Sequence, residues 1–488
     1  MGARRGRVEF DHRVPTSVDS RQVSRRATMA GGAISFAAAF ALTACSSDPK
    51  LELDPVSTPL TDTGLRDGIG DAHELVVAGA HLNVELLGQF YKRRDFASVW
   101  TTRPEQVDAI VAAVLRAGSH GLDPALFHAK QLQNRAELSV IERELLVTDA
   151  SLALADALAR GAVPVGRRRA DETLAPDRID VAALLDDAID SHDPAKVIEA
   201  LAPTTPAYRA LRRALQEYQV GAPRNDRASP NRLRAITVNL ERQRWLPRDL
   251  PTTRAWVNVA DETLVLYRAD QPVFSTRVVV GEDVERNQSP EFHATIEASF
   301  YNPPWVIPAD IAKAEILPKL DRDPDYLTRN KMIVLANGEV EQAPGPEAGL
   351  GLIMFDMPNH FDVYLHDTPD RSVFSRDNRR ISHGCIRVQN PREFAALLMD
   401  QPIETINHGI EVGSTTRNDL PTPVPVFVVY QTAFVDDRGT LQIRPDFYNR
   451  DAAIWRLLKE PFQPPRLVVQ VSDSPALRGR FRSQPQGS

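Results

Sequence analysis

The sequence predicts an α+β multidomain protein in which a helical domain precedes a β-rich domain with an inserted helical subdomain. Its 488 residues suffice for two or three domains. Apolar residues recur at three- and four-residue spacing from about residue 70 to 220, and short β-branched runs separated by turns follow from residue 256. Two cysteines exclude a disulfide-dense fold, and 65 acidic against 58 basic residues argue against non-specific nucleic-acid binding.

Residues 1–44 are predicted to be an export signal that ends at Cys45. Arginines precede an apolar stretch over residues 29–44, which is short for a membrane span. Residues 24–29 resemble a twin-arginine signal, although a threonine replaces the consensus phenylalanine, so the general export route stays open. Residues 42–45 resemble a lipobox, which predicts a lipoprotein anchored through Cys45 and facing the periplasm or cell wall. An N-terminal transmembrane anchor is the alternative.

Residues 45–69 are polar and contain prolines, as expected of a tether, and residues 70–230 are predicted to form the helical domain and a linker. Periodic apolar residues predict helices at 107–115, 145–158 and 207–218. The turn-forming stretch 220–230 is the linker.

The β-rich domain is predicted over residues 231–435, and residues 436–488 form a C-terminal extension. Helical character over 309–334 indicates an inserted subdomain, placed at 309–350. The remaining predicted elements are a helix at 391–399 and strands at 256–259, 263–267, 273–280, 361–365 and 424–430.

Cys385 is the candidate centre of chemistry, because lipidation of Cys45 leaves it as an unpaired thiol in an exported protein. A nucleophilic cysteine needs a base or a positive neighbour, and both His366 and His383 are available. Geometry alone can choose between them. Gly384 permits a tight turn, so the amides of Gly384 and Cys385 are predicted to form an oxyanion hole. Together these residues suit acyl transfer through a thioester.

Two other interpretations of these residues compete with that prediction. Cys385 is an inert buried cysteine in the first. In the second, it joins His360, His366 and His383 in a zinc site, although their spacings match no known zinc pattern.

His366 and the Ser-His-Gly-Cys run at 382–385 resemble the signature of the L,D-transpeptidases, the YkuD-domain cysteine enzymes of peptidoglycan. The resemblance covers roughly residues 70–460 and is closest to the large, scaffold-bearing YcbB-like branch. The segments that carry it are Trp100 and residues 120–124, 301–308, 316–318, 344–346, 365–369 and 444–448. It implies a helical scaffold domain, a β-rich L,D-transpeptidase catalytic domain and a capping subdomain over the active-site cleft.

The resemblance also implies roles for single residues. Cys385 would be the nucleophile, His366 its general base, and His383 would lie near the oxyanion. Arg387 stands where many relatives have asparagine and would bind a substrate carboxylate. The further substrate-binding candidates are Tyr364, Asp367, Arg379 and Ser382, and Asp367 would also orient His366, largely through its backbone.

The implied function is a peptidoglycan L,D-transpeptidase that forms 3→3 cross-links, needs no metal or organic cofactor and is acylated by carbapenems. Its partners would be donor and acceptor stem peptides, the membrane through the lipid, and cell-wall synthases. Only about ten residues lie between Gln219 and Asn231, so a separate peptidoglycan-binding module is not expected. Open alternatives are an L,D-carboxypeptidase, a protein-anchoring or exchange enzyme, and a non-catalytic wall-binding lipoprotein.

Overall fold

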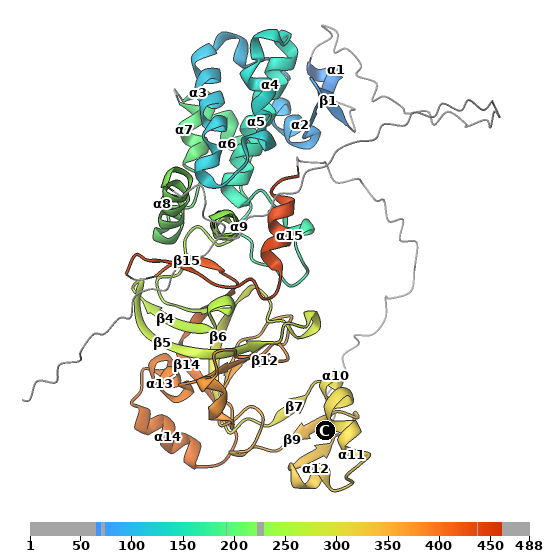
Figure 1. Cartoon of the computed structure of the whole chain (residues 1–488), viewed down its shortest axis with the longest axis vertical. Coiled ribbons are helices and arrows are strands. Elements are labelled where there is room, and N and C mark those ends of the chain that lie inside the picture. Colours follow the sequence, from blue (N-terminus) through green and yellow to red (C-terminus); the bar gives the residue numbers. More distant parts are fainter. Residues whose placement is uncertain (1–64, 70–73, 192, 222–228, 437, 461–488) are drawn as a thin grey trace, which may run out of the picture. The chain divides into compact units, whose positions relative to one another are not determined.

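The structure, a computed structural model, describes residues 65–69, 74–191, 193–221, 229–436 and 438–460 (Figure 1). The predicted export signal, Cys45, most of the tether, most of the linker and the last part of the C-terminal extension lie outside these residues. Within the described ranges no helix has both the length and the apolar character to cross a membrane.

A helical bundle forms the first part of the described chain, as predicted. Its longest helix, α5 (Val140–Arg160), starts at a capping box, in which Ser139 Oγ accepts from the Glu142 amide while the Glu142 carboxylate accepts from the Ser139 amide. The elements of this part are α1 (Leu65–Ile69), β1 (Leu75–Val77), β2 (Ala80–Leu82), α2 (Val84–Arg93), α3 (Pro104–Leu115), α4 (Ala129–Gln133), α5, α6 (Val181–Asp190), α7 (Pro194–Glu199) and α8 (Pro206–Gly221).

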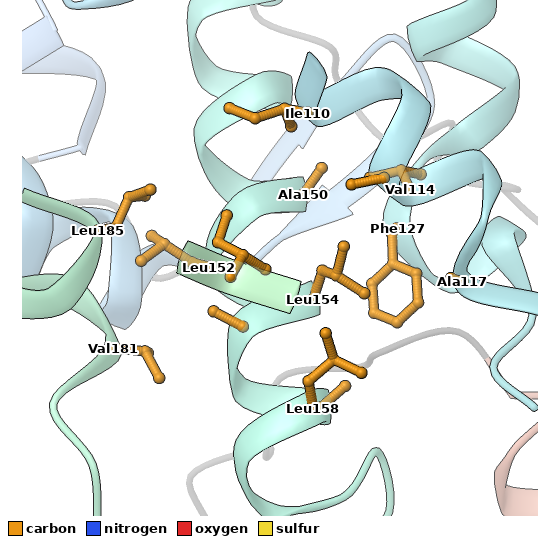
Figure 2. Packing of buried hydrophobic residues seen from close by; sticks show 14 of the residues in the cluster. Ile110, Val114, Ala117, Phe127, Ala150, Leu152, Leu154, Leu158, Val181 and Leu185 are labelled. Atoms are coloured by element: carbon orange, nitrogen blue, oxygen red, sulfur yellow. The ribbon is translucent and has the colours of Figure 1, made fainter. Parts of the chain in front are cut away.

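The bundle core forms around α5, whose Ala150, Leu152, Leu154 and Leu158 are buried beside side chains of neighbouring helices (Figure 2). Because α5 is apolar on nearly all sides, it can only be stable when it is surrounded. Replacing one of these leucines by alanine costs about 2–5 kcal/mol in such cores. The helices of the bundle therefore share one apolar core.

Helix α9 (Ser229–Arg244) has no counterpart in the sequence analysis, which assigned residues from 231 to the β-rich domain. It packs against α8 through Ile236 and Leu240. It also buries charged residues, among them the ion pair between Arg244 Nη2 and Glu241 at 2.7 Å. These buried charges interrupt the apolar periodicity by which a helix is recognised in a sequence.

The second part of the chain is built on one sheet with strand order β12-β5-β13-β11-β10-β6-β14-β3-β4. A further β4–β5 pairing closes the strands from β5 to β4 into a ring around an apolar core, and β12 is attached to β5 outside that ring. The strands are β3 (Arg254–Asn258), β4 (Thr263–Arg268), β5 (Gln271–Gly281), β6 (Phe292–Tyr301), β10 (Ile353–Asp356), β11 (Leu365–His366), β12 (Arg380–Ser382), β13 (Ile386–Val388) and β14 (Thr416–Val429). Helices α13 (Pro391–Met399) and α14 (Ile403–Glu411) precede β14. The predicted α+β multidomain class is thereby confirmed.

An insertion between β6 and β10 forms a small subdomain with its own core, centred on Ile307, Ile316 and Val340. It was predicted to be helical, but it also contains a three-stranded sheet of order β7-β9-β8. Its elements are β7 (Trp305–Ile307), α10 (Ala309–Ile311), a π-helical turn (Ala312–Ile316), α11 (Leu317–Leu320), α12 (Tyr326–Arg329), β8 (Met332–Val334) and β9 (Val340–Gln342).

The chain then adds β15 (Ala433–Val435), β16 (Leu441–Ile443) and α15 (Arg450–Leu457). Ile454 of α15 and Leu458 belong to the core of the helical bundle. Arg450 is fully buried, and its guanidinium binds Asp171 at 2.6 Å and the carbonyl of Ser289 at 3.0 Å. This segment therefore ties the helical bundle to the β-rich domain.

Candidate active site

Cys385 lies on a short turn between β12 and β13. Gly384, just before it, has φ = +118°, a conformation that glycine adopts without strain. Ser382 closes the turn, because its Oγ donates to the carbonyl of Cys385 at 2.6 Å and accepts from the Gly384 amide at 3.2 Å. The Gly384 amide is thus engaged within the turn in this conformation, and its role as an oxyanion donor stays a prediction. Ser382 shapes the turn, and its substrate contact stays a prediction.

The peptide bond between Gly384 and Cys385 is held in place by the side chain of Ser289, which is fully buried. Ser289 Oγ donates to the carbonyl of Gly384 at 2.7 Å and accepts from the amide of Gly281 at 3.0 Å. Carbonyl and amide of a trans peptide point in opposite directions, so the Cys385 N–H is aimed away from Ser289. Within the part of the chain that the structure describes, this N–H meets no acceptor. The Cys385 amide is therefore the available oxyanion donor.

Strands β11 and β13 bring the predicted site residues together. They pair in parallel, with Leu365 opposite Ile386 and His366 opposite Arg387. Leu365 and Ile386 are buried in the core of the sheet. Since side chains alternate along a strand, the other face carries His366 and Arg387, and their strand neighbours Tyr364 and Cys385 extend that face. The amide of Ile386 donates to the carbonyl of Tyr364 at 2.9 Å, which continues the pairing toward Cys385.

His366 is buried, and its Nδ1 lies 2.6 Å from the carbonyl oxygen of Asp367. Burial, and next the positive charge of Arg387, lower the pKa of His366 to about 3. The ring is therefore neutral at physiological pH and can accept a proton. An imidazole N–H that donates to a backbone carbonyl holds the ring in one orientation. This agrees with the expectation that Asp367 acts on His366 through its backbone.

The thiol of Cys385 is partly buried, and burial raises its pKa. The amide of Tyr364 and the charge of Arg387 oppose that rise. Sγ also lies 3.8 Å from the carbonyl oxygen of Asp362, to which the thiol can donate. The raised pKa of the thiol and the lowered pKa of His366 both favour the uncharged forms, a neutral thiol and a neutral imidazole.

The loop before β11 explains why a strand predicted at 361–365 shrinks to two residues. Asn359 Oδ1 accepts from the amides of Phe361 and Val363 at 3.1 and 3.3 Å. Its Nδ2 donates to the carbonyl of Val363 at 2.8 Å. Asp362 has φ = +52°, which breaks the extended chain and brings its carbonyl to the thiol.

Arg387, on the same face of the sheet as His366, has an N–H group without a hydrogen-bond partner among the described residues. Its Nε is buried and has no partner within the described residues. Burial lowers the pKa of its guanidinium, while Cys385, Asp370 and Glu315 act in the opposite sense. A guanidinium with free N–H groups beside a nucleophile suits a carboxylate ligand. Tyr364 belongs to the same face, and burial is the main cause that raises the pKa of its phenol, which therefore stays protonated.

The side chain of His383 contacts the inserted subdomain. Its Nε2 lies 2.9 Å from Oε1 of Glu315, on the π-helical turn of the insertion. Both side chains are partly exposed, at 35% and 43%. Sequence reasoning missed Glu315, because nothing in its local sequence signals a partner so far along the chain.

Two residues expected to bind substrate are engaged elsewhere. The Asp367 carboxylate accepts from the amide of Leu352 at 3.0 Å and from Arg371 at 2.6 Å. Arg379 pairs with Glu262 at 3.2 Å and donates to the carbonyl of Val278 at 3.1 Å. In this structure these contacts engage both side chains, and their substrate roles stay predictions.

The imidazole of His360 stacks on Phe361, with ring centroids 3.8 Å apart. Across the described ranges, no group of three histidine, cysteine, aspartate or glutamate side chains has the arrangement of a metal site. The zinc interpretation therefore finds no support among these residues.

The L,D-transpeptidase catalytic domain family, YkuD, matches residues 252–428, which contain the turn at Cys385 and its facing strand. The Scaffold domain family matches residues 85–215. This chain carries an L,D-transpeptidase catalytic domain behind a Scaffold domain. The predicted family resemblance is thereby confirmed.

Known relatives agree with this L,D-transpeptidase assignment. A Haemophilus influenzae protein named "Putative L,D-transpeptidase" is 30% identical over 257 residues, which cover 47% of this chain and 51% of the relative. The chain thus spans about half the length of the curated relative that it matches.

Among solved structures, an L,D-transpeptidase from Mycobacterium smegmatis is 13% identical, with 36% of this chain and 58% of that chain covered and a TM-score of 0.20. An Enterococcus faecium L,D-transpeptidase is 12% identical, with 39% and 62% covered and a TM-score of 0.19.

Proposed function

We propose that this protein is a peptidoglycan L,D-transpeptidase that forms 3→3 cross-links through a thioester on Cys385. One observation carries the proposal: Cys385 and His366 belong to the same face of the paired segments β11 and β13, and the Cys385 amide is free to receive an oxyanion. A free amide aimed at developing negative charge contributes strongly to acyl transfer.

In the first half-reaction, Sγ attacks the carbonyl carbon at the L-centre of diaminopimelate in a tetrapeptide donor. The thiol proton passes to His366, the C–S bond forms, and the Cys385 amide binds the oxyanion. His366 then protonates the departing amine, and terminal D-alanine leaves as the C–N bond breaks. Because both groups begin neutral, proton transfer accompanies attack instead of preceding it.

In the second half-reaction, the side-chain amine of an acceptor diaminopimelate attacks the thioester carbonyl. His366 takes the amine proton and returns it to the leaving thiolate, so that the C–N bond forms and the C–S bond breaks. Arg387, with its free Nε, would hold a carboxylate of the donor stem. The inserted subdomain, joined to the turn by Glu315, would limit access of water to the thioester.

The proposal includes a place for the protein in the cell envelope. The N-terminal arginines, the apolar stretch and the lipobox-like residues 42–45 support export and lipid attachment at Cys45. The protein would then face the periplasm or cell wall, where stem peptides and cell-wall synthases are found.

The test is incubation of the protein with a disaccharide-tetrapeptide, followed by mass spectrometry, beside a Cys385→Ala variant. A dimer lacking one D-alanine, together with an acyl-enzyme mass, would support the proposal if both are absent from the variant. Loss of D-alanine without any dimer would favour an L,D-carboxypeptidase. The absence of any Cys385-dependent product would favour a non-catalytic wall-binding protein.

A further inference from the structure

A cleft of about 980 Å³ opens in the Scaffold domain, between the end of α3 and helix α8. Four of its lining residues are arginines: Arg116, Arg209, Arg212 and Arg213. None of the described residues that line it is an aspartate or a glutamate. This is unexpected in a chain whose formal net charge is −7. A cleft lined by one sign of charge concentrates ligands of the opposite sign.

Most of this positive charge is not neutralised by neighbouring side chains. Arg116 pairs with Glu199 at 2.8 Å. The other three arginines have no ion-pair partner within the described residues. Their guanidinium groups are therefore available to an anionic ligand.

Two of the three available guanidinium groups are held in place by neutral acceptors. Arg212 donates from Nε to the carbonyl of Ser119 at 3.1 Å and from Nη2 to its hydroxyl at 3.0 Å. Arg209 donates to the carbonyl of Thr204 at 2.5 Å. These bonds restrict the side chains without cancelling their charge, which lowers the entropy cost of binding a ligand.

Apolar side chains lie next to these charges. Leu115 and Val220 line the same cleft and are 41% and 84% exposed, and Pro206 lies at the start of α8. A matching ligand has separate negative charges with small apolar groups between them. Nucleic acid and anionic membranes present dense, continuous charge, which this net-negative chain would repel.

We propose that this cleft binds the carboxylate-bearing stem peptides of a peptidoglycan strand, as a docking site separate from the turn at Cys385. The proposal rests on the proposed function, which makes such strands the substrate. Stem peptides alternate carboxylates with alanine methyl groups. The carboxylates would bind the arginines of the cleft, and the methyl groups would contact its apolar side chains. Docking one stem would raise the effective concentration of its neighbours at the active site.

The test measures binding of a fluorescent glycan strand that carries tetrapeptide stems, by anisotropy, to the full chain with Cys385→Ala to prevent turnover. The cleft variant combines Arg209→Gln, Arg212→Gln and Arg213→Gln. The matched control combines Lys92→Gln, Arg93→Gln and Arg178→Gln, which remove the same charge from the same domain outside the cleft. Thermal unfolding of both variants verifies that they fold.

The cleft variant should bind the strand about tenfold more weakly, from the loss of three exposed charge contacts, and the control should change less than about twofold. Strands whose carboxyl groups have been converted to amides should bind weakly to every variant. Equal affinity of the cleft variant and the control would overturn the proposal, as would tight binding of amidated strands. Cross-linking of a short soluble tetrapeptide by the Cys385-intact protein tests the proposed function separately, because that reaction does not need strand docking.

Discussion

Ser289 and Gly384 are 95 residues apart in the chain, yet the hydroxyl of the first donates a hydrogen bond of 2.7 Å to the carbonyl of the second. That bond sets the direction of the Cys385 amide. Ser289 is itself held, because Arg450 donates to its carbonyl at 3.0 Å and Tyr448 accepts from its amide at 3.3 Å. The nucleophile turn is thus supported by the segment that connects the β-rich domain to the helical bundle.

Replacing Ser289 by alanine is expected to lower kcat by about tenfold to a hundredfold, with little change in KM. The Gly384 carbonyl and the Gly281 amide would lose their buried partner, a cost of about 1–3 kcal/mol, and the Cys385 amide would no longer be fixed. Steady-state kinetics with a tetrapeptide donor measures the effect.

Ser151→Ala is the matched control, since Ser151 is equally buried and its hydroxyl donates to the carbonyl of Val147 at 2.7 Å in α5. It should lower thermal stability but leave kcat unchanged. If both variants lose kcat in proportion to their loss of stability, Ser289 has no special role in positioning Cys385.

The sequence is sufficient to single out Cys385, His366 and Arg387, because the Ser-His-Gly-Cys run and the upstream histidine form a recognisable motif, whereas the pairing of their two strands is seen only in the structure. It is insufficient to find Ser289 or Glu315, because their contacts depend on how distant segments pack. Helix α9 is missed for a related reason: its buried Glu241 and Arg244 are charged, so their burial does not show as apolar periodicity. The ion pairs of Asp367 with Arg371 and of Arg379 with Glu262 could not be predicted either, because they also depend on how the chain folds.

Arg387→Gln is expected to change the pKa of the Cys385 thiol and the pKa of the His366 imidazole in the same direction. The Arg387 charge lowers the pKa of both Cys385 and His366, so its removal should raise both pKa values. Alkylation of Cys385 by iodoacetamide, followed as a function of pH, should then shift its midpoint upward. Arg392→Gln is the control, because Arg392 binds Asn407 and is not among the groups that shift either pKa. An unchanged alkylation profile in Arg387→Gln would contradict the electrostatic role of this residue.

Glu315→Gln is expected to increase hydrolysis of the acyl-enzyme relative to cross-linking. The variant replaces the charged partner of His383 with a neutral one and so weakens the contact between the insertion and the nucleophile turn. A partly exposed pair of this kind contributes at most about 1 kcal/mol, so the ratio should rise by no more than about fivefold. Mass spectrometry of dimer and hydrolysed monomer gives that ratio directly. Glu347→Gln, an exposed substitution in the loop that follows β9, should leave it unchanged.

The neutral state of buried His366 predicts a loss of stability in acid. Its pKa is about 3 in the folded protein, against 6.5 for an ordinary histidine, so the unfolded chain binds a proton that the folded chain excludes between these values. The stabilisation is therefore complete above pH 6.5 and is lost as the pH falls toward about 3. At about pH 5 the loss of stability from this group should be roughly 2 kcal/mol.

Urea unfolding at pH 7 and at pH 5 measures this loss. The difference in unfolding free energy between the two pH values should be smaller for His366→Gln than for the native chain. His408→Gln, at an exposed position, should keep the full difference. An equal pH response in all three proteins would mean that His366 titrates normally in the fold, and it would remove the basis for a neutral resting pair with Cys385.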